Sequence, residues 1–469
     1  MDSELSKSQE TDGGHIDAQY QYHSRTRLGK AGRRRKKPRQ TKQPIGQALA
    51  KLVRHMFPWF WESCEAIEEP RENPHYSMTQ ALTLATLMFA CRIPSRRQLD
   101  KFTDDATFLR NWCVFSRAQT ETVMCSRQMI NVCAAIDPDE LEQSKPNYLR
   151  TMLRNKQAQT LYLLGHVMIA ADGTGIFSSS TSHCKQCLYQ EHKDGTVTYL
   201  HNMLEVKAVG WDGLAVPVLS EPLLNEKAYD KQDCETKAYH RALPRLKQAF
   251  PRERFLHLLD SLYCQGPIFK AIDACGHKFV CNFKRGSIPT LYDEGHELIK
   301  LSPENTSSKK FKKDGKWVLR QYYWVNGLQY YGMELAMIVC KETVGEKTTT
   351  FVFLTNFILT RDNVQIIADG ARQRWVIENQ GFSEQKNGYE LEHFCDCNDL
   401  NVMLCLYHLL QIAHLFMQLL ERSNLIESMG HLTVLAKMLL EALRNSDIPD
   451  EIFSPDAPKF QIRFAKAPP

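Results

Sequence analysis

The sequence lacks several features that would assign it to a special class. Its 469 residues contain no internal repeat, and the first 22 have no apolar core of a signal peptide. Its fifteen cysteines, an odd number, are scattered from Cys64 to Cys405 without the dense spacing of a disulfide-stapled domain. The composition, 43% hydrophobic and 24% charged, excludes collagen-like, coiled-coil and wholly disordered chains. We therefore expect a folded protein of about three structural units, with reduced thiols in a cytoplasmic compartment.

Only one apolar run is long enough to suggest a membrane span. Residues 402–420 are apolar apart from four polar side chains, which are spaced three, three and four residues apart and so share one helical face. These are His408, Gln411, His414 and Gln418. Because a lipid-facing helix would not keep such a face, we predict a buried or amphipathic helix and no membrane partner.

Acidic residues are missing from one strongly basic segment. The stretch from Arg25 to Lys42 contains ten of the 59 Lys and Arg residues; without them, 49 cations would face 54 acids, a formal charge of −5. Residues 1–43 are also poor in apolar groups, which predicts a disordered basic tail. Its densest run should bind DNA phosphates without reading bases: Arg33, Arg34, Arg35, Lys36 and Lys37.

Hydrophobic periodicity divides the remaining chain into three regions. Residues 44–157 show helical spacing, which predicts a helical region for DNA binding or dimerisation. Residues 158–400 alternate short apolar strands with helices, which predicts an α/β domain with a mixed sheet. Aromatic alternation over about 284–347 predicts antiparallel strands inserted into that domain. Residues 401–469 are predicted to form a C-terminal helical region.

Two aspartates follow apolar segments of the predicted sheet. Asp172 ends the run from Leu161, and Asp260 ends the strand from Arg254. Side chains at strand ends commonly form ligand sites in α/β sheets, and a carboxylate pair there needs a cation to stay ionised. Oxygen ligands suit Mg²⁺ or Mn²⁺, and two such ions can catalyse phosphoryl transfer. Taken singly, each aspartate is better explained as a turn or cap residue. Glu235, near the start of the helix before Asp260, is interpreted as an ordinary first-turn acid.

A third carboxylate, Glu378, lies on a predicted helix from Asn363 to Lys386, with a break at Gly370. Arg374 precedes Glu378 by four residues, so the two side chains should lie on one face. Such a pair could supply one metal ligand and one phosphate contact. The alternative is a surface ion pair of little energetic value.

These motifs resemble a known family. Asp172 in Ala-Ala-Asp-Gly-Thr-Gly, Asp260 in Leu-Leu-Asp-Ser-Leu-Tyr, and Arg374-Trp-Val-Ile-Glu378 are similar to the DDE transposases of bacterial insertion sequences. The similarity covers roughly residues 155–400, and is greatest to the group with a Tyr-Arg-Glu-Lys signature and a β-strand insertion. It implies an RNase H-like core, two Mg²⁺ (or Mn²⁺) ions held by Asp172, Asp260 and Glu378, and recognition of terminal inverted repeats.

The outer positions of that signature depart from the family. Its Tyr position falls on Ala371 and its Lys position, seven residues after the glutamate, falls on Gln385. Lys386 comes one residue later, which on an α-helix turns it about 80° from the face of Glu378. We retain Arg374, Trp375 and Lys386 as predicted DNA contacts.

A Cys-x2-Cys pair lies shortly after Asp172. Cys184 and Cys187 have three histidines nearby, at positions 183, 192 and 201, and with His192 they would make a candidate zinc site. Since four ligands are not cleanly spaced, we favour two buried thiols without a metal.

The predicted insertion combines lysines with aromatic residues. Lys309, Lys310, Lys312, Lys313 and Lys316 are close in sequence to Tyr322, Tyr323 and Trp324, which suits backbone contact with base stacking; a solvated charged loop is the alternative.

The sequence thus predicts an insertion-sequence transposase that hydrolyses phosphodiester bonds at element ends and joins the 3′-OH ends to target DNA. We expect a homodimer on double-stranded DNA in the bacterial cytoplasm, associated with the nucleoid. Two alternatives stay open: a non-catalytic DNA-binding protein with the same fold, and a metal-dependent nuclease without strand transfer.

Overall fold

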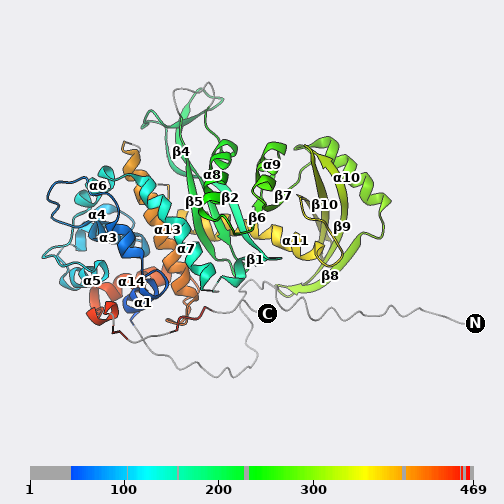
Figure 1. Ribbon diagram of the computed structural model, residues 1–469. Coiled ribbons are helices and arrows are strands. Elements are labelled where there is room, and N and C mark those ends of the chain that lie inside the picture. The colour runs from blue at the N-terminus through cyan, green and yellow to red at the C-terminus, as the bar shows by residue number, and fades with distance from the viewer. Residues whose placement is uncertain are drawn as a thin grey trace, which may run out of the picture.

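The computed structural model describes residues 44–102, 104–155, 158–225, 232–392, 398–454, 456–457 and 461–464. It is a mixed α/β structure built on an 11-stranded sheet, with helices gathered at one end of the sheet and over its faces (Figure 1). The basic run from Arg33 to Lys37 lies outside the described residues.

Helices from both ends of the chain pack together. The long helix α13 lies against α1, α3, α6 and α7, and α14 packs on α1 and α5, so the first and last helical segments share one core (Figure 1). Several begin at the caps their sequences provide, such as Ser77 with Gln80 before α3 and Asp137 before α7. These helices are α1 Ile45–Met56, α2 Phe60–Glu65, α3 Met78–Ala90, α4 Arg96–Leu99, α5 Ala106–Ser116, α6 Ser126–Ala135, α7 Pro138–Arg154, α13 Leu400–Arg422 and α14 Leu432–Asn445.

The sheet has the order β3-β4-β2-β6-β7-β11-β10-β9-β8, with β1 paired to β2 and β5 to β4. The strands β2, β6 and β7 are parallel to one another, and the other pairings are antiparallel. The strands are β1 Tyr162–Leu163, β2 His166–Ser179, β3 Leu188–Glu191, β4 Val197–Val209, β5 Ala215–Leu223, β6 Phe255–Leu259, β7 Lys278–Asn282, β8 Thr306–Lys313, β9 Lys316–Tyr330, β10 Met333–Val344 and β11 Lys347–Thr355.

Both faces of the central strands are covered. On one face Val167, Ile169 and Ala171 contribute to the main core together with α8 (Glu235–Ala249) and α9 (Gly266–Ala274). On the other, Met168 and Ala170 join a second core with α11 (Val364–Ala371) and the turns that follow it. Because successive side chains of a strand point to opposite faces of the sheet, the position of a residue in β2 decides which helices its side chain contacts.

The inserted region differs from its prediction in one respect. Its strands β8, β9 and β10 are antiparallel, as expected, but they extend the central sheet through β11, and a helix precedes them. This helix, α10 (Pro289–Leu301), was not predicted, because only Leu291 and Gly295 are buried and the apolar stripe is therefore weak.

The polar face of α13 is buried, in agreement with the prediction. Gln411 bonds Lys207 (2.5 Å) and Gln385 (2.8 Å), and His414 bonds Glu384 (3.0 Å). By length and composition α13 could cross a membrane, but 89% of its most apolar stretch is buried within the protein. Its polar side chains hold it to the sheet and to α12 (Glu384–Lys386).

Candidate active site

The two aspartates lie on neighbouring parallel strands. Strand β2 continues beyond Asp172 to Ser179, so the prediction that Asp172 ends its strand was wrong: the polar residues after it still pair with β4. Asp260 directly follows β6, as predicted, and caps the short turn after it. Ala170 pairs with Leu258 in the parallel register of β2 and β6. Continued by two residues, the same register places Asp172 beside Asp260. Neighbouring strands are about 4.8 Å apart, so both carboxyl groups start from adjacent backbones on one face.

Glu378 lies on the segment after α11, which covers the face of the sheet that carries Asp172. After α11 the chain forms a 3₁₀ turn, Arg372–Arg374, and then a π-helix, Ile377–Ser383. The α-helix breaks one residue after the predicted position: α11 continues through Gly370, which packs closely on Leu163, and ends at Ala371.

Arg374 connects two of the three carboxylates. Its guanidinium is almost fully buried and lies 2.7 Å from Glu378 Oε1 and 3.6 Å from Asp172 Oδ2. The expected placement of Arg374 beside Glu378 is thus confirmed. Because this pair also faces Asp172 in the protein interior, it is more than the surface ion pair that was the alternative reading.

A fourth carboxylate, Glu235, approaches from the opposite face. Tyr263 Oη donates to Glu235 Oε2 (3.2 Å), and a Cβ at Gly173 would lie 2.2 Å from Glu235 Oε1. Only glycine at position 173 therefore lets this carboxylate lie against the backbone of β2 next to Asp172. Interpreting Glu235 as an ordinary first-turn acid missed this role, and the adjoining Asp172-Gly173 pair was the one signal available in the sequence.

Negative charge accumulates at Asp172. Burial raises the pKa of Asp172 to about 7; Arg374 opposes the rise, while Glu378, Glu235 and Asp260 add to it. Burial also raises the pKa of Glu235. Oxygen donors under mutual repulsion are the set that a hard divalent cation binds, so these residues fit Mg²⁺ or Mn²⁺ in chemistry. Among the described residues the acids do not all come within 4.8 Å of one another, and Arg374 is the cation between them.

The π-helix changes where Gln385 and Lys386 point. Because its hydrogen bonds run from i to i+5, each π turn holds about one more residue than an α turn, and later side chains are rotated accordingly. Gln385 is completely buried against α13, so it could not be replaced by a DNA-contacting lysine. Lys386 lies 2.5 Å from Glu392, whose carboxylate reaches Gly175 on β2, three residues beyond Asp172. The predicted rotation of Lys386 by about 80° from the face of Glu378 assumed a regular α-helix, whereas the segment between them is a π-helix.

Aromatic side chains suited to stacking differ in part from those expected. Trp375, beside Arg374, is 50% exposed. Within the insertion Tyr322 and Trp324 are buried, which corrects their prediction as stacking residues, because the strand pattern turns them into the core. Trp317 is instead an exposed ring there, with Lys310 and Lys312 each 5.2 Å from its centre.

The cysteine pair has a different histidine partner from the one predicted. Cys184 and Cys187 lie beside His201, whereas His192 is exposed and bonds Thr198 (2.8 Å). The prediction of His192 was wrong because strand β4 carries His201 inward. Burial lowers the pKa of His201 to about 4.

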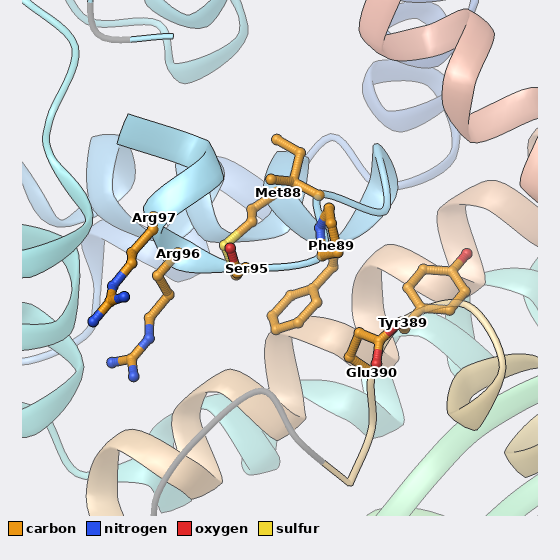
Figure 2. A pocket seen from close by; sticks show the side chains of 9 residues that line it. Met88, Phe89, Ser95, Arg96, Arg97, Tyr389 and Glu390 are labelled. Carbon is orange, nitrogen blue, oxygen red and sulfur yellow. The ribbon is translucent and has the colours of Figure 1, made fainter. Parts of the chain in front are cut away.

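A separate cavity of about 440 Å³ lies between the end of α3 and the segment after α12. Figure 2 shows Arg96 and Arg97 extending on one side of it, with Phe89, Tyr389 and Glu390 on the other. None of the four clustered carboxylates lines this cavity. It therefore offers no acid set for metal-dependent chemistry.

No known family model matches this chain, and no curated protein shows significant similarity to it.

Proposed function

We propose that this chain is a metal-dependent DNA transposase of the DDE type with an RNase H-like core. The observation that supports this most strongly is the register that brings Asp172 and Asp260 together beneath Arg374 and Glu378. The mixed order of β5, β4, β2, β6 and β7 agrees with the fold that the family resemblance implies.

Asp172, Asp260 and Glu378 would hold the two Mg²⁺ or Mn²⁺ ions, with Glu235 close enough to contribute to their field. When bound, the ions would supply activation of water and stabilisation of the leaving oxygen. Arg374 offsets the charge of Asp172 and Glu378 in the free protein and is placed to bind a phosphate oxygen of the substrate. Its burial between the acids fixes the guanidinium before DNA arrives.

The surrounding residues suit DNA as the substrate. Exposed Trp375 can stack on an unpaired base, and Lys386 lies near β2, where it can reach a phosphate. The hairpin of β8 and β9 adds lysines around Trp317, and the basic tail adds salt-sensitive affinity. Because transposition joins two element ends, we propose that a homodimer acts on DNA in the bacterial cytoplasm.

The test uses the purified full-length protein and a duplex carrying both regions that flank its coding sequence, where terminal inverted repeats are expected. Asp260→Asn should abolish Mg²⁺-dependent cleavage and preserve end binding. Asp293→Asn, an exposed acid paired with Arg285, is the control and should cleave normally. Unchanged cleavage by the Asp260 variant would refute the assignment.

Product analysis separates the alternative functions. Joined strands indicate transposition, and nicked products without joining indicate a nuclease. Binding without any metal-dependent nicking by the wild-type protein would favour a non-catalytic DNA-binding protein.

A further inference from the structure

A second site of a different chemistry lies at the far end of β2. The loop that follows this strand carries Cys184 and Cys187, and the adjacent strand β4 carries His201. Their spacing is Cys-x2-Cys-x13-His. Neither cysteine forms a disulfide in the structure.

The three donor atoms converge on one point. Cys184 Sγ and Cys187 Sγ lie 3.2 and 3.3 Å from His201 Nε2, and 3.7 Å from each other. Four-coordinate zinc, with bonds of about 2.3 Å to sulfur and about 2.0 Å to nitrogen, would separate two sulfurs by about 3.8 Å and sulfur from nitrogen by about 3.5 Å. The observed triangle is therefore close to one face of a zinc tetrahedron.

Hydrogen bonding explains this triangle less well. The ring nitrogen of a neutral histidine has one lone pair, so it can accept a hydrogen bond from only one of the two thiols. The thiol of Cys187 can then donate to Cys184 Sγ (3.7 Å), which leaves its 3.3 Å approach to the nitrogen without a role in the hydrogen bonding. A shared cation satisfies all three donors at once.

The loop is also arranged to support thiolates. The backbone N–H of Cys184 donates to Cys187 Sγ (3.3 Å), and such bonds favour the charged form of sulfur. Cys187 and His201 are buried, while Cys184 is partly exposed. The fourth ligand position would face the side of Cys184, where water can reach.

We propose that Cys184, Cys187 and His201 bind one zinc ion, which fastens the loop after β2 to β4. Two thiolates and a neutral imidazole are the donor set that zinc prefers over Mg²⁺ or Mn²⁺. The site is distinct in residues and chemistry from the carboxylate cluster, and its existence does not depend on the proposed transposase activity.

The experiment measures zinc in the full-length protein after zinc loading and gel filtration. The wild type should contain one zinc per chain, and substitution by Co²⁺ should give the visible bands of tetrahedral cobalt with a thiolate charge-transfer band. Cys187→Ser and His201→Gln should lose at least nine tenths of the zinc. His192→Gln, the neighbouring exposed histidine, is the matched control and should keep it.

Three results would overturn the proposal. The first is a wild-type zinc content below about one tenth per chain, and the second is equal loss in the His192 variant. The third is an intraloop disulfide found by mass spectrometry in protein kept under reducing conditions. The cobalt spectrum of the wild type decides the matter even where a substituted protein does not fold.

Discussion

The buried ion cluster around Glu205, the residue of β4 that pairs with Asp172 of β2, gives the sharpest stability prediction. Glu205 is fully buried and lies 3.7 Å from Lys145 Nζ and 3.6 Å from Lys207 Nζ. Tyr407 Oη also donates to it (2.8 Å). Changing Glu205→Gln would keep the shape and leave two buried ammonium groups with no charged partner at this position. Removing one member of a buried ion pair costs about 3–5 kcal/mol.

The expected loss has a definite dependence on pH. Burial lowers the pKa of Lys207 to about 8, below its unfolded value, and Glu205 opposes that shift. The unfolded chain therefore binds more protons between about pH 8 and 10.5, so wild-type stability rises with pH across that window. Without Glu205 the pKa of Lys207 in the folded protein falls further. The pH range over which stability rises with pH therefore begins at a lower pH in the variant. The difference between the two proteins should then shrink as the pH rises from about 6 to 8, where Lys207 of the wild type also loses its proton, and stay level above about pH 8.

Thermal unfolding of the two proteins across about pH 6–10 measures this. For a chain of this size about 1 kcal/mol corresponds to about 1 °C, so the midpoint should fall by about 3–5 °C at pH 7. Glu297→Gln, which removes an exposed pair with Lys300, should change the midpoint by less than about 1 °C. A midpoint difference that is as large at about pH 9 as at about pH 6 would refute the reasoning.

Much of the fold follows from local signals in the sequence. Local signals in the sequence mark the helix from Ile45 to Met56 and the helix from Gly266 to Ala274. Each has a Pro or cap signal near its start and a clear apolar stripe. The strand after Arg254 was also clear, because a short apolar run ends in polar residues.

The site was only partly readable from the sequence. Asp172, Asp260 and Glu378 were found by their placement in the apolar pattern and by the family resemblance. Glu235 was missed, because its approach to Gly173 depends on how α8 crosses the sheet, which no local pattern encodes. His192 was chosen over His201 for a similar reason: sequence distance does not tell which side of a strand faces a loop.

The π-helix bears on the outer positions of the proposed family signature. A rule of seven residues after Glu378 assumes regular α-helical turns, and such a rule selects Gln385. A wider turn rotates the side chains that follow it, and Lys386 pairs there with Glu392, whose carboxylate lies near Gly175 on the strand that carries Asp172. Hydrophobic periodicity does not reveal a π-helix, because a wider turn displaces the apolar pattern of the following residues by only one position.

The remaining predictions concern this segment and its neighbours. Gly173→Ala should displace the adjoining carboxylate of Glu235 and reduce metal-dependent cleavage at least tenfold, whereas Gly175→Ala in the same strand meets only ordinary contacts and should cleave normally; equal activities would argue against a role for that carboxylate. Lys386→Ala should weaken DNA affinity and reduce the slope of binding against salt by about one, measured by titration at several salt concentrations. Gln385→Lys would restore the family's residue at its usual spacing, yet it would put an ammonium group into a completely buried site. We therefore expect a lower unfolding midpoint and no gain in DNA affinity. Tighter binding by this variant at unchanged stability would mean that position 385, rather than 386, faces the DNA.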